Sequence, residues 1–172
     1  MSPEGAAAGF EIRPARREDV AAVHAMIRAL ADYEKLAHLV VGTAADLDAA
    51  LFGPQPAAEV LVAWKADEPA AFALFFHNFS TFLGRRGLWL EDLYVRPEFR
   101  RRGCAQALLR TLAGIARARD CGRFEWAVLD WNAPAITFYE SLGAAVLPDW
   151  RIARVTGDAL AALAESGPPP NG

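Results

Sequence analysis

Residues 94–122 read YVRPEFRRRGCAQALLRTLAGIARARDCG and join an apolar, strand-like segment to a helical pattern through a loop crowded with arginine. A helix from Gly103 to about Arg119 is predicted by apolar residues on one face, at Leu108, Leu109, Leu112, Ile115 and Ala116. A helix N-terminus offers unpaired backbone N–H groups and a positive dipole end, and glycine lets the backbone approach a ligand closely. The loop therefore indicates either a phosphate or diphosphate site or a solvated, arginine-rich surface.

Composition narrows the function classes. The 172 residues are 53% hydrophobic and carry a formal net charge of −3, which is typical of a globular protein and argues against nucleic acid or an anionic membrane as a partner. The longest apolar run, 70–76, is too short to span a bilayer, and the start lacks a secretory pattern. Cys104 and Cys121 flank one predicted helix, about 25 Å apart, so a disulfide is not expected. We expect a reduced, cytoplasmic protein.

Hydrophobic periodicity predicts a single domain at 10–165, between flexible tails at 1–9 and 166–172. The expected strands are 10–15, 59–64, 71–79, 88–95, 124–129 and 150–156. The expected helices are 20–36, a short one after the cap Thr43, 103–119, one after the cap Asn132, and 158–164. This order predicts an α/β fold with one mixed central sheet.

The spacing Arg100-x-x-Gly103-x-Ala105 resembles the R/Q-x-x-G-x-G/A acyl-CoA signature of the GCN5-related N-acetyltransferase (GNAT) superfamily. The segments LADYEKL (30–36), WLEDLYVRPEFR (89–100), FEWAVLDWNAPAITFYESLGA (124–144) and DWRIARVTGDAL (149–160) are similar to its spermidine/spermine (diamine) acetyltransferase-like branch. The resemblance implies the GNAT fold, with six to seven strands splayed in the middle of the sheet and about four flanking helices. It also implies a homodimer.

The resemblance further implies acetyl-CoA as co-substrate, with no metal. The backbone of Leu93 to Val95 would hold the pantetheine arm, and the loop of Arg101 to Gln106 would hold the diphosphate. The implied cofactor-binding residues are Leu93, Tyr94, Val95, Arg100, Arg101, Arg102, Gly103, Cys104, Ala105, Gln106, Asn132, Ala133, Pro134, Ala135 and Phe138.

Two residues carry the chemistry that the resemblance implies. Glu91 would accept the proton of the amine through water, and Tyr139 would donate a proton to the departing sulfur. The alternatives are a surface ion pair for Glu91 and a core-facing aromatic ring for Tyr139. Asp92, the next residue on the strand, is expected to point to the opposite face from Glu91.

A compact, acidic acceptor pocket is expected. Its residues would be Tyr33, Glu34, Glu91, Asp92, Glu125, Trp126 and Ala127. Glu34 could equally be a solvated helix residue. Thr81, Arg85 and Arg86 stand where the animal polyamine enzymes have a more acidic lining, which favours a short amine, such as a lysine-like or thialysine-like amino acid, over spermine.

Other interpretations remain open on the sequence. An acetyltransferase acting on protein N-termini or lysines would need a wider groove, and a non-catalytic acyl-CoA-binding regulatory module would not need Glu91 and Tyr139 together. No Cys/His cluster has metal-ligand spacing. Cys104, at a helix start beside arginines, is expected either to have a lowered pKa or to pack as an apolar residue under the loop.

Overall fold

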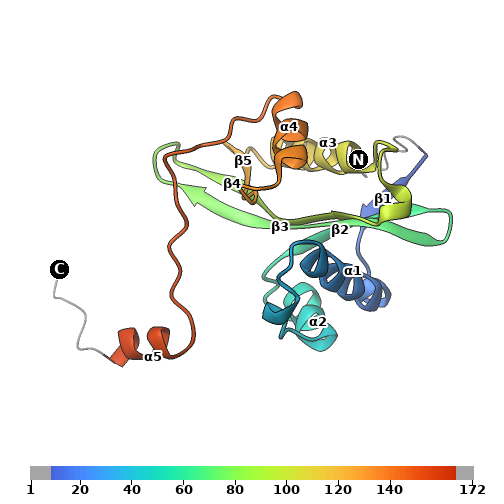
Figure 1. Ribbon diagram of the computed structural model, residues 1–172. Coiled ribbons are helices and arrows are strands. Elements are labelled where there is room, and N and C mark those ends of the chain that lie inside the picture. The colour runs from blue at the N-terminus through green and yellow to red at the C-terminus, as the bar shows by residue number, and fades with distance from the viewer. Residues whose placement is uncertain (1–8, 166–172) are drawn as a thin grey trace. The chain divides into compact units, whose positions relative to one another are not determined.

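The computed structural model describes residues 9–165 (Figure 1). The chain divides into two compact units, Met1–Ala127 and Val128–Gly172, and each is described by itself. The predicted tails lie outside the described residues, apart from Gly9.

The first unit is built on one five-stranded sheet in the order β1-β2-β3-β4-β5. The strands are β1 (Glu11–Pro14), β2 (Glu59–Lys65), β3 (Glu68–Ser80), β4 (Arg85–Val95) and β5 (Phe124–Trp126). The first four strands pair antiparallel with their neighbours, and β5 pairs parallel with β4. The mixed sheet that the residue patterns predicted is therefore present.

Helices cover both faces of this sheet (Figure 1). The helices α1 (Val20–Tyr33) and α2 (Ala44–Phe52) lie on one face, and α3 (Cys104–Ala118) lies on the other. Short 3-10 turns occur at Arg17–Asp19, Ala37–Leu39 and Pro97–Phe99. The core under α1 and α2 contains Val23, Met26, Leu51, Val60, Val62, Phe72 and Tyr94. The buried face of α3 contains four of the five apolar residues that its periodicity identified, Leu108, Leu109, Leu112 and Ala116, whereas Ile115 is half-buried.

The second unit contains α4 (Ala133–Ser141) and α5 (Gly157–Glu165). Asn132 caps α4, as predicted: its side-chain oxygen accepts a hydrogen bond from the backbone N–H of Ala135 at 3.4 Å. The helix closes at Gly143, whose φ of 91° is in the left-handed region that favours glycine.

Three element predictions were wrong. The sheet has five strands and not six or seven, because 150–156 forms no strand and β5 ends at Trp126, short of the predicted residue 129. No strand is described in the second unit, so 150–156 has none there to pair with, and an alternating pattern cannot supply that partner. The first helix ends at Tyr33, three residues before the predicted end, and Lys35 then adopts a φ of 62°.

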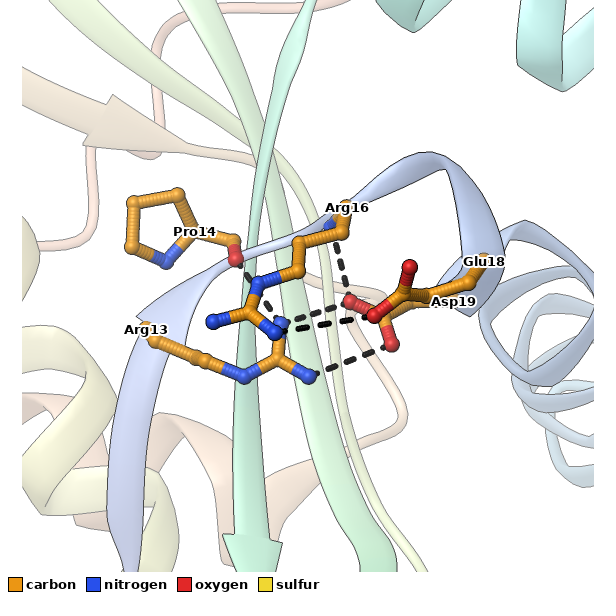
Figure 2. Close-up of polar contacts among 5 residues, drawn as sticks. All are labelled: Arg13, Pro14, Arg16, Glu18 and Asp19. Atoms are coloured by element: carbon orange, nitrogen blue, oxygen red, sulfur yellow. Dashed lines mark hydrogen bonds and ion pairs between the residues drawn. The ribbon is translucent and has the colours of Figure 1, made fainter.

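A buried ion pair joins β1 to the start of α1 (Figure 2). The Asp19 carboxylate accepts hydrogen bonds from Nη1 and Nη2 of Arg13 at 2.7 and 3.2 Å, and from the backbone N–H of Arg16 at 2.7 Å. Burial alone would raise the pKa of Asp19, but the Arg13 and Arg16 hydrogen bonds and charges hold it below its ordinary value. The ionised pair therefore stabilises the fold above the pKa of the unfolded carboxyl group.

We expect Asp19→Asn to lower the free energy of unfolding at pH 7 by about 2–4 kcal/mol, because Arg13 loses its charged partner in a largely buried site. The pKa of Asp19 is depressed in the folded state, so this difference from wild type should shrink as the pH falls below about 3.9. Urea denaturation at pH 7 and pH 3.5 measures it. Glu18→Gln, which removes an exposed carboxylate, is the matched control and should change little. A difference that is equal at both pH values would contradict this account.

Candidate active site

The N-terminus of α3 presents unpaired backbone donors. The first hydrogen bond of the helix runs from the N–H of Ala107 to the carbonyl of Gly103 at 2.9 Å. Within residues 9–165, the backbone N–H groups of 101–106 donate no hydrogen bond. Gly103 and Arg101 both have positive φ, 78° and 59°, which curls the loop ahead of the helix. Unpaired donors, a positive dipole end and exposed arginines fit the diphosphate of a CoA-type ligand.

The three arginines of this loop do not have the same surroundings. Arg101 and Arg102 are exposed, and neither makes an ion pair with a described residue. Arg100 instead bends back: its Nε donates to the carbonyl of Val95 at 3.0 Å. Its guanidinium carbon lies 5.1 Å from the ring centroid of Tyr33 and 5.8 Å from that of Tyr94. Arg100 therefore links the end of α1 to the end of β4.

A β-bulge interrupts β4 at Glu91. Leu90 pairs with Phe75 and Asp92 with Leu74, so Glu91 has no partner of its own on β3. Asp92 consequently shares the α1 face with Leu74, and Trp89, the partner of Phe76, belongs to the same face. The indole N–H of Trp89 donates to the Glu91 carboxylate at 2.8 Å, which draws that carboxylate toward this face too. The prediction that Glu91 and Asp92 point to opposite faces was therefore wrong.

Asp92 has the most perturbed carboxyl group near the bulge. Burial raises its pKa to about 6, and the negative charges of Glu91 and Glu34 add to the effect. Burial also raises the pKa of Glu34, which follows Tyr33 at the end of α1. Three carboxyl groups from α1 and β4 thus interact at one end of the sheet, where they would favour a cationic ligand.

The pairing between β4 and β5 ends beside these carboxylates. β5 pairs only with Leu88, Trp89 and Leu90, and Glu91–Val95 of β4 has no strand on that side among the described residues. This is the splay that the fold class implies. Of the predicted β5 residues, Glu125 is engaged locally: its carboxylate lies 2.7 Å from Nε of Arg123 and 3.5 Å from the amide nitrogen of Asn78. The Trp126 ring packs edge-on against Phe124, and Ala127 is exposed.

The remaining predicted site residues lie in the second unit. Tyr139 is half-buried on α4, with its ring centroid 5.5 Å from that of Phe138. Ala133, Pro134 and Ala135 form the first turn of the same helix, after the cap Asn132. Their functional roles stay predictions of the resemblance.

Cys104 is a packing residue and not an activated thiol. Its side chain is 2% exposed, and burial raises its pKa to about 11. The alternative of a lowered pKa was wrong because the thiol points into the core, where desolvation of the thiolate outweighs the helix dipole and the nearby arginines.

The sequence analysis did not identify three features of the site. Trp89 stands two residues before Glu91, and strand periodicity could have placed the two side chains together. The bulge has no comparable sequence signal, because neither glycine nor proline marks it. The bridge from Arg100 to Tyr33 joins residues far apart in the chain and emerges only from the tertiary structure.

Comparison with known proteins agrees with this geometry. The model of the Acetyltransferase (GNAT) family matches residues 22–144. The chain belongs to the GNAT acetyltransferase family. It is 34% identical to the L-ornithine N5-acetyltransferase NATA1 of Arabidopsis thaliana, over 94% of this chain and 91% of that protein. It is 36% identical to the thialysine N-epsilon-acetyltransferase of Mus musculus, over 91% and 98% of the two chains.

Among solved structures, an integron cassette protein from the mobile metagenome of V. cholerae has the same fold, with a TM-score of 0.76 at 24% identity over 91% of this chain and 98% of that one. The GNAT chain is an acetyl-CoA-dependent N-acetyltransferase, and its relatives agree with the diamine acetyltransferase-like branch. Residues 9–165 include no helix long and apolar enough to cross a membrane, and no cluster of three potential metal ligands.

The interacting carboxylates give a direct electrostatic test. We expect the Asp92 carboxyl group to titrate near pH 6 in the free protein. Glu91→Gln should lower this midpoint, because of the two neighbouring carboxylates Glu91 has the larger effect on the pKa of Asp92. Carbon-detected NMR of the side-chain carboxyl groups, with Asp92→Asn to assign the signal, measures both values. Glu98→Gln, which removes the exposed partner of Arg96, is the control and should leave the midpoint unchanged. An Asp92 midpoint near 4 in both proteins would contradict this description of the site.

Proposed function

We propose that this GNAT enzyme transfers the acetyl group of acetyl-CoA to the side-chain amine of a small amino acid of the ornithine, lysine or thialysine type. One observation carries the proposal. The unpaired amides at the start of α3 follow the end of β4 after one 3-10 turn, and the bulge in β4 turns two carboxylates to one face. An anion-binding helix end beside a cation-binding acidic face suits an anionic cofactor and an ammonium acceptor. The ornithine and thialysine acetyltransferases among the relatives support this choice of acceptor.

In this proposal the backbone of Arg101 to Gln106 holds the diphosphate, and the side chains of Arg101 and Arg102 supply positive charge beside it. The outward N–H groups of Leu93 to Val95 hold the pantetheine arm at the open edge of β4. For Asn132 and the first turn of α4, a cofactor-binding role rests on the resemblance to the family. Bound acetyl-CoA supplies an acetyl group already activated as a thioester. The protein's residues orient the amine, remove its proton and protonate the leaving thiolate.

Glu91 is the proposed proton acceptor. It is exposed, so water can relay the proton from the amine, and the hydrogen bond from Trp89 fixes the carboxylate. Asp92 and Glu34 attract and orient the incoming ammonium ion. Because Asp92 titrates near neutral pH, its charge responds to whether a cation is bound.

Tyr139 is the proposed acid. A phenol with an ordinary pKa of about 10 stays protonated at neutral pH until a thiolate forms beside it. This role rests on the match of Asn132 and Tyr139 to the family pattern. A homodimer and a cytoplasmic location likewise rest on the resemblance and on the sequence alone.

The loop from β3 to β4 argues against spermine as the preferred acceptor. Thr81, Arg85 and Arg86 are all exposed, and the loop has no acidic residue of its own. Arg85 pairs with Asp120 at 3.2 Å, which offsets the negative charge of that carboxylate. A long polycation would meet positive charge here, whereas a short amino acid would not reach it.

The proposal predicts that L-ornithine, L-lysine or thialysine exceeds spermidine and spermine in kcat/KM by roughly tenfold or more. The measurement is release of free thiol from acetyl-CoA across a panel of these amines, with acceptor-free protein as background. If a polyamine is the best acceptor by tenfold, the acceptor class is wrong. If no amine stimulates thiol release, the catalytic proposal itself fails.

Tyr139→Phe tests the proposed role of Tyr139 as the acid. It should lower kcat with the best acceptor by roughly 10²–10⁴-fold while the KM for acetyl-CoA stays nearly unchanged, because only the acidic proton is removed. Wild-type turnover in this variant would show that Tyr139 serves packing alone.

A further inference from the structure

Arg100 is exposed, but it is the member of the arginine loop (Arg100, Arg101 and Arg102) whose side chain contacts aromatic residues on the α1 side of the sheet. Its guanidinium lies against two aromatic rings, with Tyr33 at the end of α1 and Tyr94 in the core under α1 and α2. Its Nε is used by the carbonyl of Val95. The two terminal nitrogens, Nη1 and Nη2, make no hydrogen bond or ion pair within residues 9–165.

This placement separates the Arg100 side chain from the helix end that suits the diphosphate. Tyr94 pairs with Phe72 on β3, and both rings belong to the core on the α1 face, whereas α3 packs on the opposite face. The guanidinium is also rigidly presented, since two rings and one hydrogen bond restrict its rotamers. A fixed cation with its outer donors unused is suited to an anion that carries two oxygens.

Arg100 shares this face with the carboxylates that favour an ammonium ion. Asp92 and Tyr94 are two residues apart on one face of β4, which corresponds to about 6.6 Å. Glu34 directly follows Tyr33, whose ring contacts the Arg100 guanidinium. Asp92, Glu34 and the Arg100 guanidinium therefore all belong to the α1 side at this end of the sheet. A chain of three or four methylenes, with bonds of about 1.5 Å, spans a comparable distance.

We propose that Arg100 binds the carboxylate of the acceptor, so that the enzyme selects an amino acid with an amine at its other end over the corresponding diamine. This inference rests on the proposed function, and it assigns the specificity for the amino-acid class to one residue. The carboxylate would take the outer guanidinium donors, while Asp92 and Glu34 hold the amine. A diamine or polyamine would leave those donors unpaired and add a positive charge beside them.

The test compares pairs of acceptors that differ only by the carboxylate, L-ornithine with putrescine and L-lysine with cadaverine. Arg100→Gln should lower kcat/KM for the two amino acids by about tenfold or more, the value of a charge-assisted contact, and should leave the two diamines unchanged or improved. The KM for acetyl-CoA should stay within a few-fold of wild type. Arg100→Lys, which keeps the charge without the fork, should show an intermediate loss for the amino acids only.

Arg110→Gln is the matched control, since Arg110 is an exposed arginine on α3 with no assigned role, and it should change neither ratio. Circular dichroism and thermal unfolding verify that each variant folds. An equal loss for amino acids and diamines together with a raised KM for acetyl-CoA would overturn the inference, since Arg100 would then serve the cofactor. No loss in Arg100→Gln would overturn it too.

Calorimetry distinguishes failure of this inference from failure of the proposed function. If wild-type protein acetylates no amine, the proposed function fails, and binding of L-ornithine and putrescine to wild type and Arg100→Gln in the presence of CoA decides the inference alone. Ornithine binding that is weakened tenfold or more in Arg100→Gln, with putrescine binding unaffected, supports the carboxylate contact. Equal ornithine binding to both proteins, or none to wild type, refutes it.

Discussion

The register break at Glu91 is the constraint on which the site depends. An uninterrupted β4 would alternate its side chains and place Glu91 and Asp92 on opposite faces of the sheet. The bulge instead aligns Asp92 with Leu74, and Trp89 draws the Glu91 carboxylate to the same face. Bulges also bend and twist a strand, and β5 stops pairing with β4 at Leu90, one residue before the bulge. One inserted residue thus gathers the carboxylates beside the opening in the sheet.

Two regions near the end of β4 favour ligands of opposite charge. The start of α3 contributes unpaired N–H groups, a positive dipole end and two exposed arginines. On the α1 face, burial raises the pKa of Asp92, and the negative charges of the exposed Glu91 and the half-buried Glu34 add to the effect. The backbone of Arg100 belongs to the loop before α3, but its side chain lies against Tyr33 at the end of α1. In the proposal, a loop segment that resembles an acyl-CoA signature therefore also contributes to the choice of acceptor.

The parts of the fold that depend on local pattern could be predicted from the sequence. The periodicity of Leu108 and Leu112 identified α3, and the residue pattern predicted the strands β2, β3 and β4. Glycine and arginine at the start of α3 predicted a cofactor site there, and the unpaired amides of 101–106 fit that prediction. The features that depend on contacts between residues far apart in the chain could not be predicted. A strand at 150–156 has the right alternation but no described neighbour in its unit, and the pKa of Cys104 followed its burial and not its place at a helix end.

The central claim is that the start of α3 and the open edge of β4 form one cofactor site. The most direct measurement is a titration of ¹⁵N-labelled protein with CoA, following the backbone amide signals. The account predicts saturable shifts concentrated in 101–106, whose N–H groups are unpaired, and in 93–95 at the open edge. Dephospho-CoA, which retains the diphosphate, should shift the same amides. Shifts confined to other elements, or no saturable shift in 101–106, would contradict the account.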